Sequence, residues 1–246
     1  MPLTPANTLL ASLPRKVYLQ MLPSLSPVTL GFGQVLHEHG AALPEVYFPE
    51  TCVVSLLVVV DQNALEVALV GYEGLVGLSL GLGAELSPVR ALVQGEGVAL
   101  RLSRPYFRAA LQEHPALRRA VYGYAGSLMA QIGQTAACNR FHQVHARLAR
   151  WLLMTRDRLG SGEFRVTQEF LSAMLGVRRV GVSEAASAFR QQHLIEYSRG
   201  VITILDHAGL EAACCSCYAL DAARAGAIAQ WRPDSAAAGA PPEVAG

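Results

Sequence analysis

The stretch that decides the fold reads VTQEFLSAMLGVRRVGVSEAA at residues 166–186 and continues after a short gap as LIEYSRGVITILD at residues 194–206. Apolar residues recur at helical spacing on both sides of Gly176, which predicts two short helices joined by a tight turn. The second segment alternates apolar and polar residues and breaks at residues 198–200, as a β-hairpin does. Two such helices followed by a hairpin form a winged helix-turn-helix, a unit typical of proteins that read DNA.

The second of these helices, residues 178–191, is predicted to lie in the major groove with its first turns nearest the bases. Val177, Val182 and Ala186 are expected to face the core. An arginine fork matches the O6 and N7 atoms of guanine, and one such contact discriminates between bases by about 1–3 kcal/mol. The candidate base-reading residues are those on the outer face: Arg178, Arg179, Val180, Ser183, Glu184 and Ser187.

Contacts with the DNA backbone are expected at two other places. Thr167 and Gln168 begin the first helix, where unpaired N–H groups favour phosphate, and Arg199 stands at the tip of the hairpin. The charge distribution agrees with this. Ten basic and five acidic residues occur in 140–199, whereas residues 1–103 hold four basic and eight acidic ones. A positive segment that coincides with the helix-turn-helix is what phosphate binding requires.

Composition indicates a globular protein. The 246 residues are enough for one large or two ordinary domains. No apolar run approaches the ~18 residues that a membrane span needs. The N-terminus does not resemble a secretory signal, and the five cysteines do not suggest a disulfide framework. We therefore expect a cytoplasmic protein without a membrane partner.

The N-terminal half is predicted to consist mainly of short strands. Turn residues, mostly glycine, separate them at regular intervals, which indicates a sandwich or roll. A helical segment with a break at Pro14 precedes them. The predicted strands are residues 28–30, 35–37, 46–48, 53–60, 65–70, 91–94 and 98–102.

A long helix is predicted for residues 115–141. One of its faces has the step pattern of a coiled-coil seam, four and three residues in turn: Leu117, Val121, Tyr124, Leu128, Gln131, Thr135 and Cys138. We expect this seam to join two copies of the chain, because a paired DNA reader needs a symmetric joint. The alternative is a helix that lies on the β domain of its own chain.

Two further helices are predicted, over about residues 143–159 and 207–222. Beyond them, alanine, glycine, proline and serine dominate, which predicts a disordered tail. The helix at 143–159 is amphipathic, and the positions outside its apolar face include Arg147, Arg150, Arg156 and Arg158.

The order of these parts resembles the Crp/Fnr family of bacterial transcription regulators, named after the cyclic-AMP receptor protein and the fumarate/nitrate regulator. The resemblance covers about residues 8–218. It is carried by YFP at 47–49, VGYEGLVG at 70–77 and the helix-turn-helix at 166–186. It implies an α+β fold with an N-terminal β-roll like that of cyclic-nucleotide-binding domains, a long dimerisation helix and a C-terminal winged helix-turn-helix. The implied domains are residues 1–114, 115–141 and 142–222, followed by a tail at 223–246.

By this resemblance the chain is a transcription regulator that binds double-stranded promoter DNA as a homodimer, with RNA polymerase as a further partner if it activates. Arg179 falls at a base-reading position of the family. Val180 replaces a glutamate that often follows, and Glu184 stands where the receptor protein has an arginine. The target half-site should therefore differ from that of the receptor protein.

The resemblance also locates an effector pocket at Gly77, Leu78 and Arg90. Cyclic-nucleotide binders of the family hold the ribose with a glutamate, where this chain has Leu78. They hold the phosphate with an arginine, and alignment of the strand puts Val89 at that position. Because a buried phosphate needs a paired cation, we do not expect cyclic AMP to bind. The signal is then another small molecule, which the sequence does not identify.

No cofactor is expected. Iron–sulfur regulators of the family use N-terminal cysteines, and the first cysteine of this chain is Cys52. His37, His39 and Cys52 are the candidates for a haem ligand in the roll, although packed or surface side chains are the simpler interpretation.

Two groups of residues have the spacing of metal ligands. Cys138, His142 and His145 would share one helix face, and the segment 214–217 holds three cysteines, Cys214, Cys215 and Cys217. Cys138 falls on the predicted seam as a small apolar residue, and His142 and His145 lie among arginines. The cysteine segment has no fourth ligand at a set spacing, so no metal is expected from either group.

Two other classes of function are weighed against a DNA-binding regulator. One is a signalling module whose roll binds a small molecule and whose C-terminal domain mediates protein contacts; the paired Arg178 and Arg179 favour DNA instead. The other is an enzyme, which is not expected, because the sequence has no nucleophile–base pair, phosphate loop or metal motif.

Overall fold

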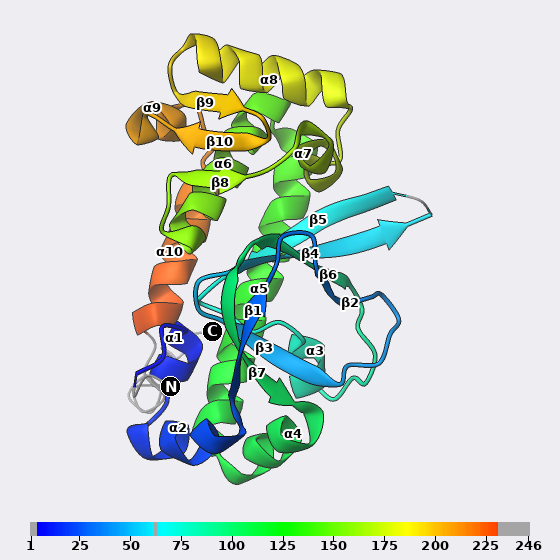
Figure 1. Cartoon of the computed structure of the whole chain (residues 1–246), viewed down its shortest axis with the longest axis vertical. Helices are drawn as coiled ribbons and strands as arrows, with labels where there is room; N and C mark the ends of the chain where they lie inside the picture. Colours follow the sequence, from blue (N-terminus) through cyan, green and yellow to red (C-terminus); the bar gives the residue numbers. More distant parts are fainter. Residues whose placement is uncertain (1–3, 62, 231–246) are drawn as a thin grey trace, which may run out of the picture.

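The structure, a computed structural model, describes residues 4–61 and 63–230, with only the backbone described for 224–230. The molecule is elongated, with a β-roll towards one end and the helix-turn-helix at the other (Figure 1). Helix α5 (Pro115–Phe141) runs between them, and α6 (Val144–Leu159) continues into the helix-turn-helix. Within the described residues, no helix has both the length and the apolar character needed to cross a bilayer.

The roll consists of the seven strands that the sequence predicts. They form two antiparallel sheets, ordered β1-β7-β3 and β2-β6-β4-β5. Apolar side chains from both sheets, among them Phe48, Val54 and Leu100, belong to one buried core. The strands are β1 (Ser26–Leu30), β2 (Val35–His37), β3 (Glu45–Pro49), β4 (Val53–Val60), β5 (Asn63–Val70), β6 (Arg90–Gly95) and β7 (Gly97–Ser103).

Short helices surround the roll. The predicted break at Pro14 is confirmed, since it separates the first two helices. Asn7 ties the N-terminal segment to the roll, because its Nδ2 atom donates to the carbonyl oxygens of Pro49 and Gly74, both at 2.9 Å. The short helices are α1 (Thr8–Ala11), α2 (Arg15–Met21), the 3-10 helix η1 (Leu22–Ser24), α3 (Leu78–Gly81) and α4 (Arg104–Glu113).

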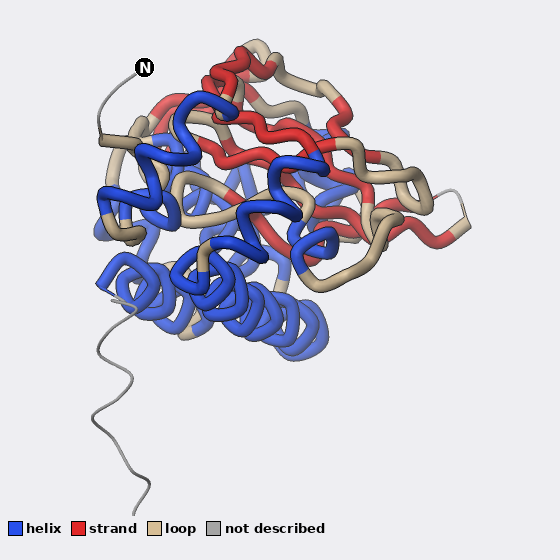
Figure 2. The backbone as a smooth tube through the Cα atoms, turned by 90° about the horizontal axis from the view of Figure 1, so that it is seen from below, coloured by secondary structure: helices blue, strands red, loops and turns tan. Residues whose placement is uncertain are grey.

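Helix α5 is the predicted long helix, but the seam assigned to it is wrong. Leu117, Val121 and Tyr124 are buried in the core of the roll of the same chain. Figure 2 shows the reason, since the long helices form a layer beneath the strands. A four-and-three step marks a helix face that packs, and here that face packs on its own β domain.

A second face of α5 carries the same step pattern and is exposed. Met129 is 71% exposed and Tyr122 is 53% exposed. A Cβ added at Gly126 or Gly133 would have no neighbour within 4 Å, so the backbone itself is accessible there. The exposed seam, as this face is called below, consists of Tyr122, Gly126, Met129, Gly133, Ala136 and Arg140.

Helix α6 confirms the predicted amphipathic helix, but three of its arginines are not on the surface. Arg158 pairs with Glu73 of the roll at 2.8 Å, and Arg150 pairs with Asp221 at 2.7 Å. Arg147 is also buried and donates to a main-chain carbonyl. These arginines add to the positive charge of the sequence segment without adding to a DNA-facing surface.

The C-terminal domain contains the three-stranded sheet β8-β10-β9 beside two helix pairs. The single helix predicted near 207–222 is two helices, and the second extends to Gln230, into the tail predicted as disordered from 223. The rest of that tail, 231–246, lies outside the described residues. The elements are β8 (Glu163–Arg165), α7 (Gln168–Leu175), α8 (Arg179–Gln191), β9 (Ile195–Ser198), β10 (Val201–Ile204), α9 (His207–Ala212) and α10 (Cys217–Gln230).

A buried polar network joins α6 to the roll. Glu66 of β5 accepts hydrogen bonds from Ser55 Oγ at 2.6 Å and from Trp151 Nε1 at 2.9 Å. Beside it, Gln94 Nε2 donates to Thr155 Oγ1 at 3.0 Å. Burial raises the pKa of the Glu66 carboxyl to about 7, and the two hydrogen bonds to it offset only part of that effect.

We expect Glu66→Gln to remove a pH dependence of stability. The carboxyl has its ordinary pKa of 4.5 when unfolded and about 7 when folded. Between these values the unfolded state releases a proton that the folded state keeps, so the wild type loses up to roughly 3 kcal/mol as the pH rises. Urea unfolding of both proteins at pH about 5 and about 7.5 measures this.

The control for this experiment is Glu96→Gln, which changes an exposed carboxylate of the same roll. Glu96→Gln should lose as much unfolding free energy between the two pH values as the wild type does. If Glu66→Gln shows the same loss as the wild type, Glu66 does not cause the pH dependence of stability.

Candidate DNA-binding surface and sensor cavity

The turn of the helix-turn-helix has the geometry that the sequence predicts. Thr167 caps α7, its Oγ1 atom accepting from the N–H of Phe170 at 3.1 Å. Gly176 ends α7 in the left-handed conformation with φ of 60°. The positive φ favours glycine at this position, and a Cβ there would also displace the Cδ1 atom of Leu65 of β5, 2.7 Å away.

Most candidate base-reading residues lie on the outer face of α8. Val182, Ala186 and Phe189 are buried in the domain core. Val180 is 66% exposed. Arg178 is the residue that precedes the helix. Those with exposed side chains are Arg178, Arg179, Val180, Glu184 and Ser187.

Ser183 differs from the other candidates. It is half-buried, and its Oγ atom donates to Oε1 of Gln168 at 2.8 Å. The two residues were assigned separately, one to bases and one to phosphate. The structure shows that they hold α7 and α8 together, so both are partly committed to that contact.

The wing is a tight hairpin whose tip faces solvent. Arg199 and Gly200 both have positive φ, 50° and 78°, as a two-residue hairpin turn requires. Arg199 is exposed there. Arg165 on the neighbouring strand β8 is also exposed, with its guanidinium 5.6 Å from the ring centre of Phe32. Figure 1 shows α8 and the wing together at the end of the molecule away from α2.

A cavity lies between the roll and α5, at the predicted effector pocket. Gly77 and Leu78 line it, and Gly77 has φ of 88°. Arg90 is wrong as a pocket residue, because it does not line the cavity and its Nε atom lies 3.4 Å from Glu38. Val89 does line it, as expected for the residue in the place of the phosphate-binding arginine.

The lining of this cavity is mainly apolar. The exceptions are His37, Ser79 and Ser87, and Ser87 donates to the carbonyl of Val89 at 2.6 Å. His37 is 4% exposed, and its Nε2 atom has no hydrogen-bond partner. Burial lowers the pKa of this histidine, which favours the neutral ring. Contributions from α5 include Leu128 and Ile132.

The three haem-ligand candidates do not form one site. His37 borders the cavity, whereas His39 is exposed. Cys52 lies in the core, and burial raises the pKa of its thiol to about 12, which disfavours the thiolate that would bind iron.

Comparison with known proteins was made on sequence and on structure. Residues 146–213 match the family model of the Crp-like helix-turn-helix domain. No curated protein matches the chain in sequence.

Solved structures resemble about three quarters of this chain. FixK2 from Bradyrhizobium japonicum aligns at a TM-score of 0.66 with 14% identity, covering 78% of this chain and 98% of its own. A transcriptional regulator of the CRP family from Thermus thermophilus aligns at 0.64 with 20% identity, covering 76% and 95%. The c-di-GMP-responsive regulator CLP from Xanthomonas campestris aligns at 0.64 with 14% identity, covering 78% and 100%.

A β-roll joined through a long helix to a winged helix-turn-helix is the architecture of the Crp/Fnr transcription regulators. The expected resemblance to that family is confirmed in fold. The chain carries a Crp-like helix-turn-helix domain at residues 146–213.

The exposed seam of α5 is the feature that sequence reasoning missed. Its step pattern was present in the sequence, but another face, one or two residues earlier at each step, has the same pattern with more apolar residues. The signal that could have found it is the pair Gly126 and Gly133, seven residues apart in a long helix, since glycine is costly there unless close contact requires it.

Proposed function

We propose that this protein is a homodimeric transcription regulator that reads promoter DNA with α8. The observation that carries the proposal is the outer face of α8. Arg179, Val180 and Glu184 extend from a helix whose other side is buried, and they contact no other part of the described chain through an ion pair or core packing. Such a row at the end of a molecule suits the edges of base pairs.

The roles of the residues follow from their positions. Arg179 stands at the first turn of α8, where an arginine fork meets guanine, and Val180 offers a methyl contact to thymine. Thr167 and Arg199 flank this turn and suit phosphates. Gln168 and Ser183 support the orientation of α8, because the hydrogen bond between them joins α7 to α8.

The exposed seam is proposed as the contact between the two copies. Its apolar members, Tyr122 and Met129, would be covered by the same face of a second α5. Gly126 and Gly133 have open space above them and allow two helices to approach closely. A two-fold axis along α5 would present two copies of α8 to successive turns of DNA, as a paired reader requires.

The cavity is proposed as the sensor, with an effector that is mainly apolar. His37 Nε2 is its one buried polar atom without a partner in the described chain, which suits a ligand with a single hydrogen-bonding group. A ligand there would also touch Leu128, Met129 and Ile132 of α5, and Met129 belongs to the exposed seam as well. Binding could therefore change the contact between the two copies.

A signalling module that binds other proteins is the alternative. The cavity is compatible with it, but the exposed arginines at the start of α8 and at the wing tip favour DNA. Binding of duplex DNA that weakens with salt would exclude the alternative.

We expect Arg179→Ala and Arg199→Ala to differ in kind. Loss of a guanine contact should reduce the preference for the specific site over random duplex by about 1–3 kcal/mol. Loss of a phosphate contact should weaken both duplexes alike and lower the salt slope by about one. Fluorescence anisotropy across a salt series measures both quantities, on the site selected from a random pool.

Arg156→Ala is the control, because this arginine lies on α6 away from α8 and the wing and contacts Asp157. It should leave both quantities near the wild-type values. Equal losses on both duplexes from Arg179→Ala and Arg199→Ala would defeat the assignment of roles.

Met129→Glu should convert the dimer to a monomer, because it sets two carboxylates against each other at the two-fold axis. Sedimentation velocity at micromolar concentration measures this. Tyr106→Glu, which changes an exposed aromatic residue of α4, is the control and should remain dimeric. A wild type that sediments as a monomer, or a Met129→Glu dimer, would contradict the proposed seam.

Cyclic AMP at millimolar concentration should change neither the melting temperature nor the affinity for DNA. The cavity holds no cation for the phosphate and no carboxylate for the ribose. Thermal unfolding and anisotropy with and without the nucleotide test this, with adenosine as the control. A rise in melting temperature that is specific to cyclic AMP would disprove the sensor argument.

A further inference from the structure

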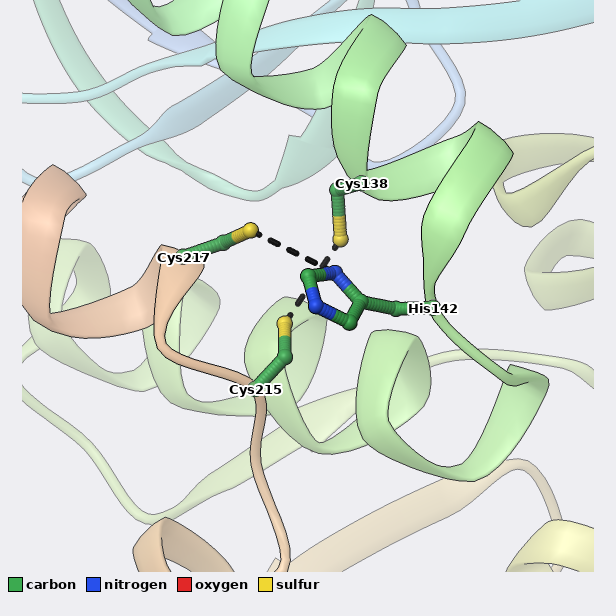
Figure 3. Close-up of side chains that lie close together, drawn as sticks. All are labelled: Cys138, His142, Cys215 and Cys217. Atoms are coloured by element: carbon green, nitrogen blue, oxygen red, sulfur yellow. Dashed lines mark hydrogen bonds between the residues drawn. The ribbon is translucent and has the colours of Figure 1, made fainter.

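Four potential metal ligands converge where the end of α5 meets the segment between α9 and α10. Cys138 lies in α5 and His142 is the C-terminal cap of that helix. Cys215 lies in the turn before α10, and Cys217 is the first residue of α10. One ligand atom from each lies within 4.8 Å of all the others. Figure 3 shows the four side chains pointing toward one another.

We propose that Cys138, His142, Cys215 and Cys217 bind one tetrahedral divalent metal ion, and that zinc fits this donor set best. Three thiolates and one imidazole are a common set for structural zinc. Zinc–sulfur bonds of about 2.3 Å and zinc–nitrogen bonds of about 2.0 Å put tetrahedral ligands roughly 3.5–3.8 Å apart.

Two of the six separations between ligand atoms have the values of that geometry, and all six are within 4.8 Å. The sulfur atoms of Cys138 and Cys215 are 3.6 Å apart, and Cys217 Sγ lies 3.5 Å from His142 Nδ1. The same distances disfavour an iron–sulfur cluster, whose thiolates attach to different irons around the outside of the cluster and stand further apart. A single ion is the better fit.

The surroundings suit a centre with excess negative charge. One divalent ion with three thiolates and a neutral imidazole carries one net negative charge. Arg147 and Arg150 are buried close to this cluster, and both border the same small cavity as Cys138. Gln134 Nε2 donates to Cys217 Sγ at 3.0 Å, an outer contact of the kind that orients a metal-bound thiolate.

Shielding from water is also suitable for a structural ion. Cys138 and Cys217 are 1% and 2% exposed, and Cys215 is half-buried.

The two nearest candidates of the same kinds are directed elsewhere. Cys214 Sγ faces the carbonyl oxygen of Ala146 at 3.7 Å. The ring of His145 packs against Phe189, with the ring centres 6.0 Å apart. Cys214 and His145 therefore provide matched controls for Cys215 and His142.

The proposed ion would add a covalent link between two parts of the chain that packing and single polar contacts, such as that of Gln134 with Cys217, otherwise hold together. His142 stands between α5 and α6, at the junction where the DNA-binding domain leaves the long helix. An ion that joins this junction to α10 would restrict how the helix-turn-helix turns relative to α5.

The test uses the purified full chain, produced with zinc and kept reduced. Elemental analysis should find one zinc per chain, and replacement by cobalt should give the visible absorption of tetrahedral cobalt with thiolate ligands. Removal of zinc by a chelator should lower the melting temperature. Cys138→Ser and Cys215→Ser should each lose the cobalt absorption, whereas Cys214→Ser and His145→Gln should retain it.

His142→Cys keeps the proposal testable if the serine variants fail to fold. It replaces the imidazole with a fourth thiolate, so it should retain zinc and shift the cobalt absorption. Reduced wild-type protein that binds no zinc or cobalt would overturn the proposal. Equal loss of metal from the control variants, or the absorption of an iron–sulfur cluster, would also overturn it. So would a Cys138–Cys215 disulfide that persists under reducing conditions.

Discussion

The position of the helix-turn-helix domain relative to the roll depends on a buried ion pair between Arg158 of α6 and Glu73 of the roll. Both side chains are less than a tenth exposed, so loss of either partner would leave a buried charge without compensation, at a cost of about 3–5 kcal/mol. Helix α6 lies so close to the roll at this point that a Cβ added to Gly71 would be 2.7 Å from Cγ of Arg158. A second contact, the hydrogen bond from Trp151 of α6 to Glu66 of β5, also fixes α6 on the roll. Helices α7 and α8 pack on α6, so their position relative to the roll is fixed as well.

Local patterns were sufficient for the strands and for the helix-turn-helix. Alternation and glycine turns reflect the periodicity of the strand itself, and the φ of 60° at Gly176 was implied by the residue type. Which partner covers a helix face is not a local property. The step pattern of α5 was read correctly as a packing face, yet Leu117 and Val121 pack on the roll, while the less apolar seam at Met129 is exposed. Likewise, the sequence does not reveal that Arg150 meets Asp221, which is far along the chain.

The same distinction applies to the sites. The outer face of α8 follows from helical spacing alone, and five of its six candidates are exposed. The cavity was located by resemblance, and its apolar character agrees with Leu78 and Val89, but Arg90 turned out to face Glu38. The four ligands of the proposed metal centre were visible only as two incomplete groups, because the fold alone brings the end of α5 to the segment before α10.

Helix α10 packs along the molecule and joins its N-terminal and C-terminal parts. It contacts α1, α5 and α6, so that the two ends of the described chain lie close together (Figure 1). Asp221 on this helix is the counter-ion of buried Arg150, and the match to the Crp-like helix-turn-helix domain ends before it, at residue 213. A fragment cut at the boundary of that domain would therefore keep the guanidinium of Arg150 and lose the carboxylate of Asp221. Helix α10 completes the packing of the helix-turn-helix domain, and an isolated fragment should be designed to include it.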